Sequence, residues 1–233
     1  MAGSITGVDS DSSATNATSY SFTVDTGTPA SDREIVVCAA ARIASTSGDI
    51  SGLTIDGNPA TLCGKALNTA DGSTTNVLAV YSLAVPTGAS SAVVVSFPVT
   101  MLRCAVVVFA KTGADTAVHA TAPSSSLTSG NPSVNIAVPA GGVVAACFMN
   151  AANTTVTWAG PTEYADFAVE ANTTVSGAAG NYASAQSPLA VSVTPANNAG
   201  SPTLLAVSWG PAASGGSIIP LVIHHMREQG MAA

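Results

Sequence analysis

The hydrophobic and polar positions of the chain form two series of short strand patterns that follow the same order. Within each series a segment of alternating polar and apolar residues is followed by an almost continuously apolar run, a short segment ending in a turn, and a last apolar run. Alternation with a period of two and runs of β-branched residues both indicate β-strands. The first series occupies residues 19–24, 34–40, 53–57 and 102–109, and the second occupies residues 133–138, 142–148, 155–160 and 203–209.

Residues that favour turns separate these strand patterns at the intervals expected of an all-β protein. Asp56-Gly57 predicts a hairpin between residues 53–55 and 60–63, because these residues supply the positive φ angles of a tight connection. Pro86-Thr87-Gly88 predicts a second hairpin, between residues 77–85 and 92–97. No window shows uninterrupted helical spacing of apolar residues. The fold class that follows is all-β, either two β-sandwich repeats of the Ig-like or jelly-roll-like kind or one merged sandwich.

Several strands are apolar at every position instead of at every second one. Residues 35–41 and 143–148 are the clearest cases. Continuously apolar strands are covered on both faces. In a sandwich one face meets the partner sheet, so the other face must meet a second repeat, a loop or a neighbouring subunit. This pattern therefore gives a first indication of assembly.

Polar, Ser-rich and Pro-rich stretches divide the chain into five segments. We expect an extended arm at residues 1–17, a first sandwich at 18–120, a linker at 121–132, a second sandwich at 133–216, and a C-terminal edge strand and tail at 217–233. Ile219, Leu221 and Ile223 alternate on one face of that last strand, so another chain or the body of the protein should cover them. These three residues are the candidate interface, and we expect a homo-oligomer.

Charge is scarce and its balance is acidic. Only 8% of the residues are Asp, Glu, Lys or Arg, compared with roughly 25% in ordinary soluble domains. The net charge of −7 opposes binding to phosphates, so nucleic acid is not an expected partner. Apolar runs are too short to form a membrane-spanning helix, so we expect no membrane partner. The N-terminal residues show no secretory signal, and we expect synthesis in a cytoplasm.

The residues that could carry chemistry do not form a recognisable catalytic pattern. The neutral-pH bases are His119, His224 and His225, and no Gly-x-Ser-x-Gly elbow accompanies them. Adjacent histidines on a strand point to opposite faces, so one subunit cannot easily direct both to one metal. We therefore expect no catalytic residues, no cofactor and no metal. Four cysteines, mostly within apolar runs, are expected to be reduced core thiols.

Glu163, Asp166 and Glu170 form the densest acidic cluster and lie near Trp158 and Tyr164. Paired carboxylates can hydrolyse glycosidic bonds, and aromatic rings can stack on a sugar. Acidic residues on a solvated strand edge are the simpler interpretation of this cluster.

Several short sequence segments resemble segments of a group of small accessory proteins from the particles of tailed bacteriophages and prophages. They are residues 53–61, 84–88, 138–144, 157–163 and 208–211. The resemblance implies a β-sandwich virion protein without catalytic residues, located on the particle and contacting other capsid or tail proteins. On this basis we expect a non-enzymatic structural protein that decorates or stabilises the capsid.

An alternative function is a tail-associated or fibre-associated module that binds host-surface carbohydrate. Its candidate contact residues are Trp158, Tyr164 and Trp209. The low aromatic content of 5% favours the structural role, because a sugar-binding surface needs several stacking rings.

Overall fold

The computed structural model describes residues 2–170, 172–197 and 200–213, and within them the chain forms seventeen β-strands and no helix. The strands of the first half are β1 (Ser4–Ser13), β2 (Ala17–Asp25), β3 (Glu34–Ile43), β4 (Gly52–Ile55), β5 (Asn58–Pro59), β6 (Thr61–Asn68), β7 (Thr75–Ala84), β8 (Ser90–Met101) and β9 (Arg103–Thr112). Those of the second half are β10 (Ala114–Ser124), β11 (Ser133–Val138), β12 (Gly142–Asn150), β13 (Val156–Ala159), β14 (Thr162–Ala168), β15 (Thr174–Tyr182), β16 (Gln186–Pro195) and β17 (Thr203–Pro211).

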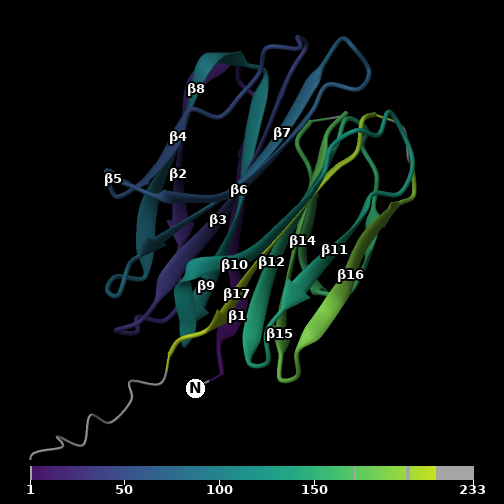
Figure 1. The fold of residues 1–233 in the computed structure, drawn as a ribbon. Helices are drawn as coiled ribbons and strands as arrows, with labels where there is room; N and C mark the ends of the chain where they lie inside the picture. Colours follow the sequence, from purple (N-terminus) through teal and green to yellow (C-terminus); the bar gives the residue numbers. More distant parts are fainter. Residues whose placement is uncertain (1, 171, 198–199, 214–233) are drawn as a thin grey trace, which may run out of the picture.

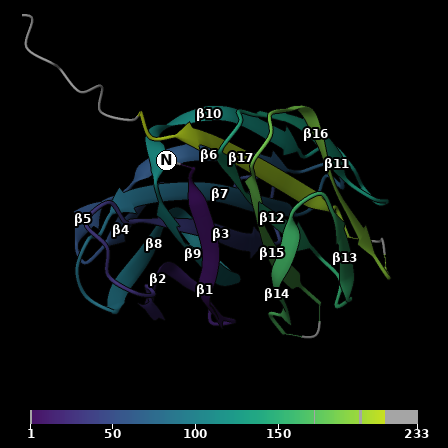
Figure 2. The same ribbon diagram turned by 90° about the horizontal axis from the view of Figure 1, so that it is seen from below.

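The strands make four antiparallel sheets that stack as four layers (Figures 1 and 2). The two inner sheets have the strand orders β1-β9-β3-β7-β6 and β10-β17-β12-β15-β14. The outer sheets are β2-β8-β4-β5, which covers the first inner sheet, and β11-β16-β13, which covers the second. Three apolar cores separate the layers, and the central one joins the two inner sheets. The fold is therefore two β-sandwiches packed back to back.

The strand order confirms that the architecture is duplicated. The inner sheets of the two halves have the same strand order. In that order β1, β9, β3, β7 and β6 correspond to β10, β17, β12, β15 and β14. In the outer sheets β2, β8 and β4 correspond to β11, β16 and β13, while β5 has no counterpart among the described strands. The two series of apolar patterns in the sequence are thus β2, β3, β4 and β9, and β11, β12, β13 and β17.

The boundary between the repeats lies at Gly113, between β9 and β10, and not in the expected linker at residues 121–132. Gly113 has a φ of 62°, which turns the chain directly from the last strand of one repeat into the first strand of the next. Residues 121–124 belong to β10. Residues 125–132 connect β10 to β11 inside the second repeat, as residues 14–16 connect β1 to β2 inside the first.

Of the extended arm expected at residues 1–17, the structure describes residues 2–17, and these do not form a free arm. Ser4–Ser13 is strand β1, which pairs antiparallel with β9 at the margin of the first inner sheet. Its polar composition fits this position, because most of its residues are only half-buried or are exposed. Ile5 is the exception, since its side chain is buried in the central core. An edge strand with one solvated face has the same polar pattern as a free arm.

The continuously apolar strands are covered on both faces, and the second repeat provides the second cover. Along β3, Ile35 and Val37 face the outer core of the first sandwich, whereas Val36 and Cys38 face the central core. The same division holds on β12, where Val144 belongs to the outer core of the second sandwich. The sequence left a second repeat, a loop or a neighbouring subunit as the cover of the second face. The structure shows that the second repeat covers it.

Of the two predicted hairpins, one is confirmed at its turn and the other is wrong. Asp56 and Gly57, with φ values of 50° and 78°, connect β4 to β5. The second strand of this hairpin is residues 58–59 and not the expected 60–63, because residue 61 already begins β6 of the inner sheet. The chain reversal at residues 85–89 instead carries it from β7 in the inner sheet to β8 in the outer sheet. The side chain of Arg33 holds this crossover, donating hydrogen bonds to the carbonyls of Val85, Thr87 and Gly88 at 2.7–2.9 Å. Pro and Gly signal a reversal, but they do not determine whether the flanking strands pair.

Buried amides connect the two repeats at one end of the central core. Asn68 donates to the carbonyls of Leu127 and Pro202, and Asn76 donates to those of Gly200 and Ser201, at 2.9–3.2 Å. Because both asparagines are fully buried, these hydrogen bonds satisfy amide N–H groups that would otherwise be costly to bury. The two repeats are thereby fixed relative to each other.

Candidate interaction groove

The two inner sheets meet along two lateral margins, and one of these is closed. There β6 packs against β10 and β17. A Cβ placed on Gly64 would lie 2.7 Å from the methyl carbon of Thr121, and the Thr121 hydroxyl donates to the Cys63 carbonyl at 3.0 Å. The two sheets are therefore in direct contact at this margin.

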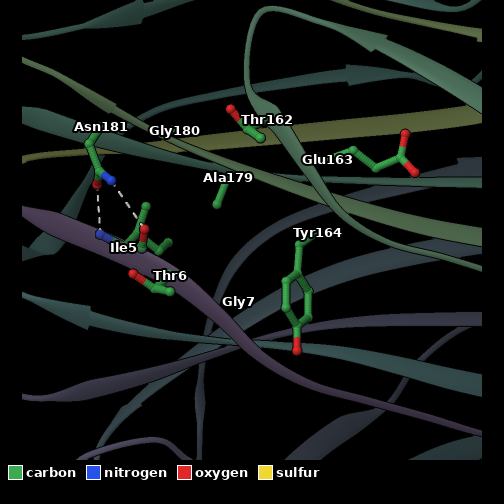
Figure 3. Close-up of a pocket in the computed structure, with 9 residues that line it drawn as sticks. All are labelled: Ile5, Thr6, Gly7, Thr162, Glu163, Tyr164, Ala179, Gly180 and Asn181. Atoms are coloured by element: carbon green, nitrogen blue, oxygen red, sulfur yellow. Dashed lines mark hydrogen bonds between the residues drawn. The ribbon is translucent and has the colours of Figure 1, made fainter.

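The opposite margin, where β1 faces β14 and β15, holds a groove of about 380 Å³, shown in Figure 3. We refer to it as the seam groove. Figure 2 shows β1 running alongside β15 and β14 at this margin. The lining residues come from both repeats and are Ile5, Thr6, Gly7, Thr162, Glu163, Tyr164, Ala179, Gly180 and Asn181.

One end of the seam groove is closed by an amide that substitutes for a strand. The Asn181 side chain accepts a hydrogen bond from the backbone N–H of Ile5 at 2.7 Å and donates one to its carbonyl at 3.3 Å (Figure 3). Nearby, the N–H of Gly3 donates to the Gly141 carbonyl at 2.8 Å. These bonds show that the edge of β1 opposite β9 faces the second repeat.

The same edge continues past Ile5 to Gly7. Backbone groups of alternate residues point to the same side of a strand, so those of Gly7 are directed to the side on which Asn181 binds Ile5. Gly7 lines the groove. Here, unlike at Ile5, no side chain takes the place of a paired strand among the described residues. The seam groove therefore presents an open strand edge.

Tyr164 packs its ring on the backbone of Gly7. A Cβ at position 7 would lie 2.0 Å from Cγ of Tyr164, so only glycine fits beneath the ring. The ring also packs against Phe109, the β9 partner of Gly7, with 6.0 Å between the ring centroids. The side chain is nevertheless 43% exposed. Tyr164 thus closes the central core on one side and offers an aromatic surface to the groove on the other.

The surroundings of the seam groove are acidic. Glu163 is exposed at its rim, and partial burial together with the nearby Asp166 raises the pKa of its carboxyl. Burial, with smaller effects from the charges of Asp9 and Asp25, raises the pKa of Tyr164. The part of each shift that comes from neighbouring carboxylates means that further negative charge is unfavourable here. The groove therefore favours a cationic or neutral ligand over an anionic one.

The structure does not bring the three proposed sugar contacts together. Only Tyr164 lies in the groove. Trp158 packs against the outer core of the second sandwich, and its Nε1–H donates to the Ser176 hydroxyl at 2.8 Å. Trp209 is fully buried in the central core, with Lys111 Nζ 4.6 Å from the centre of its ring, so it cannot stack on a glycan.

The acidic cluster is also separated, because its members serve different structural contacts. Glu170 pairs with Arg103 at 3.0 Å, and Asp166 accepts a hydrogen bond from the Val156 N–H at 3.1 Å. Glu163 alone reaches the seam groove. The candidate interface residues Ile219, Leu221 and Ile223, together with His224 and His225, lie outside the described residues.

Two residues that shape the groove carried no signal in the sequence. Gly7 lies in a polar segment in which glycine ordinarily marks a loop, and Asn181 lies near a turn in which asparagine is common. Their roles depend on contacts with the other repeat, more than 150 residues away in the chain. Within the described parts of the chain, no three His, Cys, Asp or Glu side chains are grouped to hold a metal ion.

Across residues 2–170, 172–197 and 200–213 there is no helix of the length and hydropathy needed to span a membrane. Comparisons with protein-family models, with curated proteins and with solved structures gave no match for this chain. The case for its function therefore rests on its own residues and geometry.

Proposed function

We propose that this protein is a non-enzymatic structural component that binds protein neighbours, and that it serves on a bacteriophage particle by decorating or stabilising the capsid. The proposed location on a bacteriophage particle is supported by the resemblance of five sequence segments to accessory virion proteins. These segments are residues 53–61, 84–88, 138–144, 157–163 and 208–211. On this proposal its partners are virion proteins and further copies of itself. It would be made in the bacterial cytoplasm and then incorporated into the virion.

The observation that carries the proposal is the joining of two sandwiches through a third apolar core, which makes the two repeats one body. The central core is filled by apolar side chains from both inner sheets, including Phe109 and Trp209. Close packing of this kind makes a stiff body. The seam groove is a surface feature of that body. Such a body suits lasting contacts with other proteins.

Binding to particles that lack this protein tests the proposed function. Purified protein should sediment with the undecorated particles in a saturable manner and increase their resistance to heat or low ionic strength. A matched control is another all-β protein of similar size and net charge. Absence of saturable binding to heads and to tails would contradict the proposal.

A second candidate function is carbohydrate binding, and the exposed ring of Tyr164 in the seam groove favours it. Stacking on an aromatic ring, together with hydrogen bonds to the hydroxyls of Thr6 and Thr162 and to the carboxylate of Glu163, is a chemistry that suits a sugar. Glycan-array binding that is lost in Tyr164→Ala but retained in Trp158→Phe would favour this candidate over the structural one.

A further inference from the structure

The distribution of charge separates the described body from the C-terminal segment. Residues 1–213 contain five Lys and Arg against twelve Asp and Glu. Residues 217–227 hold the sixth, Arg227, beside His224 and His225, and contain no acidic residue. Six apolar residues accompany them: Ile218, Ile219, Leu221, Val222, Ile223 and Met226. This segment therefore combines apolar and basic side chains.

All five cationic side chains of the described body are engaged within it. Arg33 binds backbone carbonyls of the crossover, and Arg42 donates to the Asn172 carbonyl at 3.0 Å. Lys65 pairs with Asp49 at 2.9 Å, Arg103 pairs with Glu170, and the buried Lys111 pairs with Glu34. The acidic groups around the seam groove have no such partner among these cations, so a cationic ligand must come from elsewhere.

The seam groove has the features that a segment of this composition needs. Tyr164 and Ala179 offer apolar surface, and Gly7 offers the open edge of β1 to a backbone in the extended form. Glu163 lines the rim, and Asp9 and Asp25 lie close enough to Tyr164 to raise its pKa. An aromatic ring flanked by carboxylates attracts a guanidinium or imidazolium group.

We propose that the seam groove of one copy binds residues 217–227 of a second copy, an inference that rests on the proposed structural function and names the partner. A second copy fits better than the same chain. Ala212 and Ala213, the last described residues, lie beside Asp32, Ala114 and Asp115, outside the lining of the groove. The proposed function makes further copies of the protein its partners, so the segment of a second copy is the proposed occupant.

Full-length variants altered on one side of the contact test this proposal. The groove variants are Glu163→Gln, which removes a rim charge without disturbing the core, and Tyr164→Ala, which removes the ring. The segment variant is Leu221→Asp with Ile223→Asp. Asp32→Asn is the matched control, because it removes one negative charge beside the exit of the chain and leaves the groove intact. Thermal melting checks that each variant is folded.

We expect light scattering to show concentration-dependent self-association of the wild type and of Asp32→Asn. The Tyr164→Ala variant and the segment variant should each associate at least tenfold more weakly, and Glu163→Gln should show a smaller loss and a weaker dependence on salt. The decisive experiment mixes Tyr164→Ala with the segment variant. Tyr164→Ala keeps an intact C-terminal segment and the segment variant keeps an intact groove. The mixture should therefore form a one-to-one complex. A synthetic peptide of residues 214–233 should compete with it.

Self-association that is unchanged in both groove variants would overturn the inference while leaving the proposed function in place. A wild-type protein that is monomeric at every concentration yet binds undecorated particles would also overturn the inference and leave the proposed function in place. A protein that neither self-associates nor binds particles would overturn both. A mixture that fails to form the one-to-one complex, with both variants folded, would also exclude this pairing of segment and groove.

Discussion

Cys38 on β3 and Cys147 on β12 lie on corresponding strands of the two repeats, and their side chains meet in the central core. A hydrogen bond with the thiol of Cys147 and complete burial both raise the pKa of Cys38 well above its ordinary value. The two repeats therefore contact each other, near the middle of two buried strands, through a pair of thiols. Neither cysteine forms a disulfide.

The first prediction concerns the reactivity of these thiols. Cys38, Cys63, Cys104 and Cys147 are all buried and free, so a thiol reagent should modify none of them quickly in the native protein. In denaturant, mass spectrometry should find four alkylated cysteines. Cys63 should be the first to react under mild conditions, because its exposed fraction, 8%, is the largest of the four. Fewer than four modified thiols in denaturant would reveal a disulfide and contradict the prediction.

The second prediction is a loss of stability at alkaline pH. Burial is a cause of the raised thiol pKa in Cys38, Cys63 and Cys104, so each thiol is a weaker acid in the folded than in the unfolded chain. Their contribution is complete below the unfolded pKa of 9.0 and is lost as the pH rises through the folded values. The free energy of unfolding should fall by about 1.4 kcal/mol per pH unit for each fully buried thiol.

Urea titrations between pH 7.5 and 10.5 measure this slope. Cys104→Ala is the matched variant, because it removes one of the deeply buried thiols. Its stability should be lower at neutral pH but should fall less steeply as the pH rises. A wild-type protein whose stability stays constant to pH 10.5 would show that the thiols ionise as easily in the folded state as in the unfolded state.

The strand patterns predicted most of the fold, because the residue types of a buried strand show which of its faces are covered. β3 and β12 are apolar at every position from 35 to 41 and from 143 to 148, which correctly indicated two covered faces. β1 was missed because an edge strand with a polar surface does not differ in composition from a free arm. Trp209, a candidate sugar contact from the sequence, is instead buried in the central core together with the apolar run in which it lies. The seam groove could not be predicted, because Gly7 and Tyr164 meet only through the packing of the two repeats.

The third prediction concerns the N-terminal strand, which we expect to be part of the folded body. Ile5 is buried in the central core, while its neighbour Thr6 points away from that core. Ile5→Ala should lower the free energy of unfolding by about 2–4 kcal/mol, whereas Thr6→Ala should change it by less than about 0.5 kcal/mol. Deletion of residues 1–17 should destabilise the protein further, because it uncovers the edge of β9. A deletion variant with wild-type melting behaviour would contradict the prediction.

The fourth prediction tests the contact between Gly7 and Tyr164. In Gly7→Ala the new methyl group would overlap Cγ of Tyr164, an atom near the backbone that cannot move away easily. We expect a loss of about 1–3 kcal/mol. The double variant with Tyr164→Ala should recover part of that loss, since the space is then free. Additive losses in a double-mutant cycle would show that the ring does not occupy this position.

The fifth prediction compares the two partners of one ion pair that joins the repeats. Arg103 is nearly buried, and besides pairing with Glu170 it donates to the Val169 carbonyl at 3.3 Å and to the hydroxyl of Thr173 at 2.9 Å. The Glu170 side chain is 49% exposed, so solvent screens its share of the interaction. Arg103→Ala should cost about 2–4 kcal/mol, because buried acceptors lose their donor, whereas Glu170→Gln should cost less than about 1 kcal/mol. Equal losses in urea unfolding would assign the stabilisation to the ion pair itself. A clear difference would assign it to the hydrogen bonds by which Arg103 of the first repeat fixes the loop between β14 and β15 of the second.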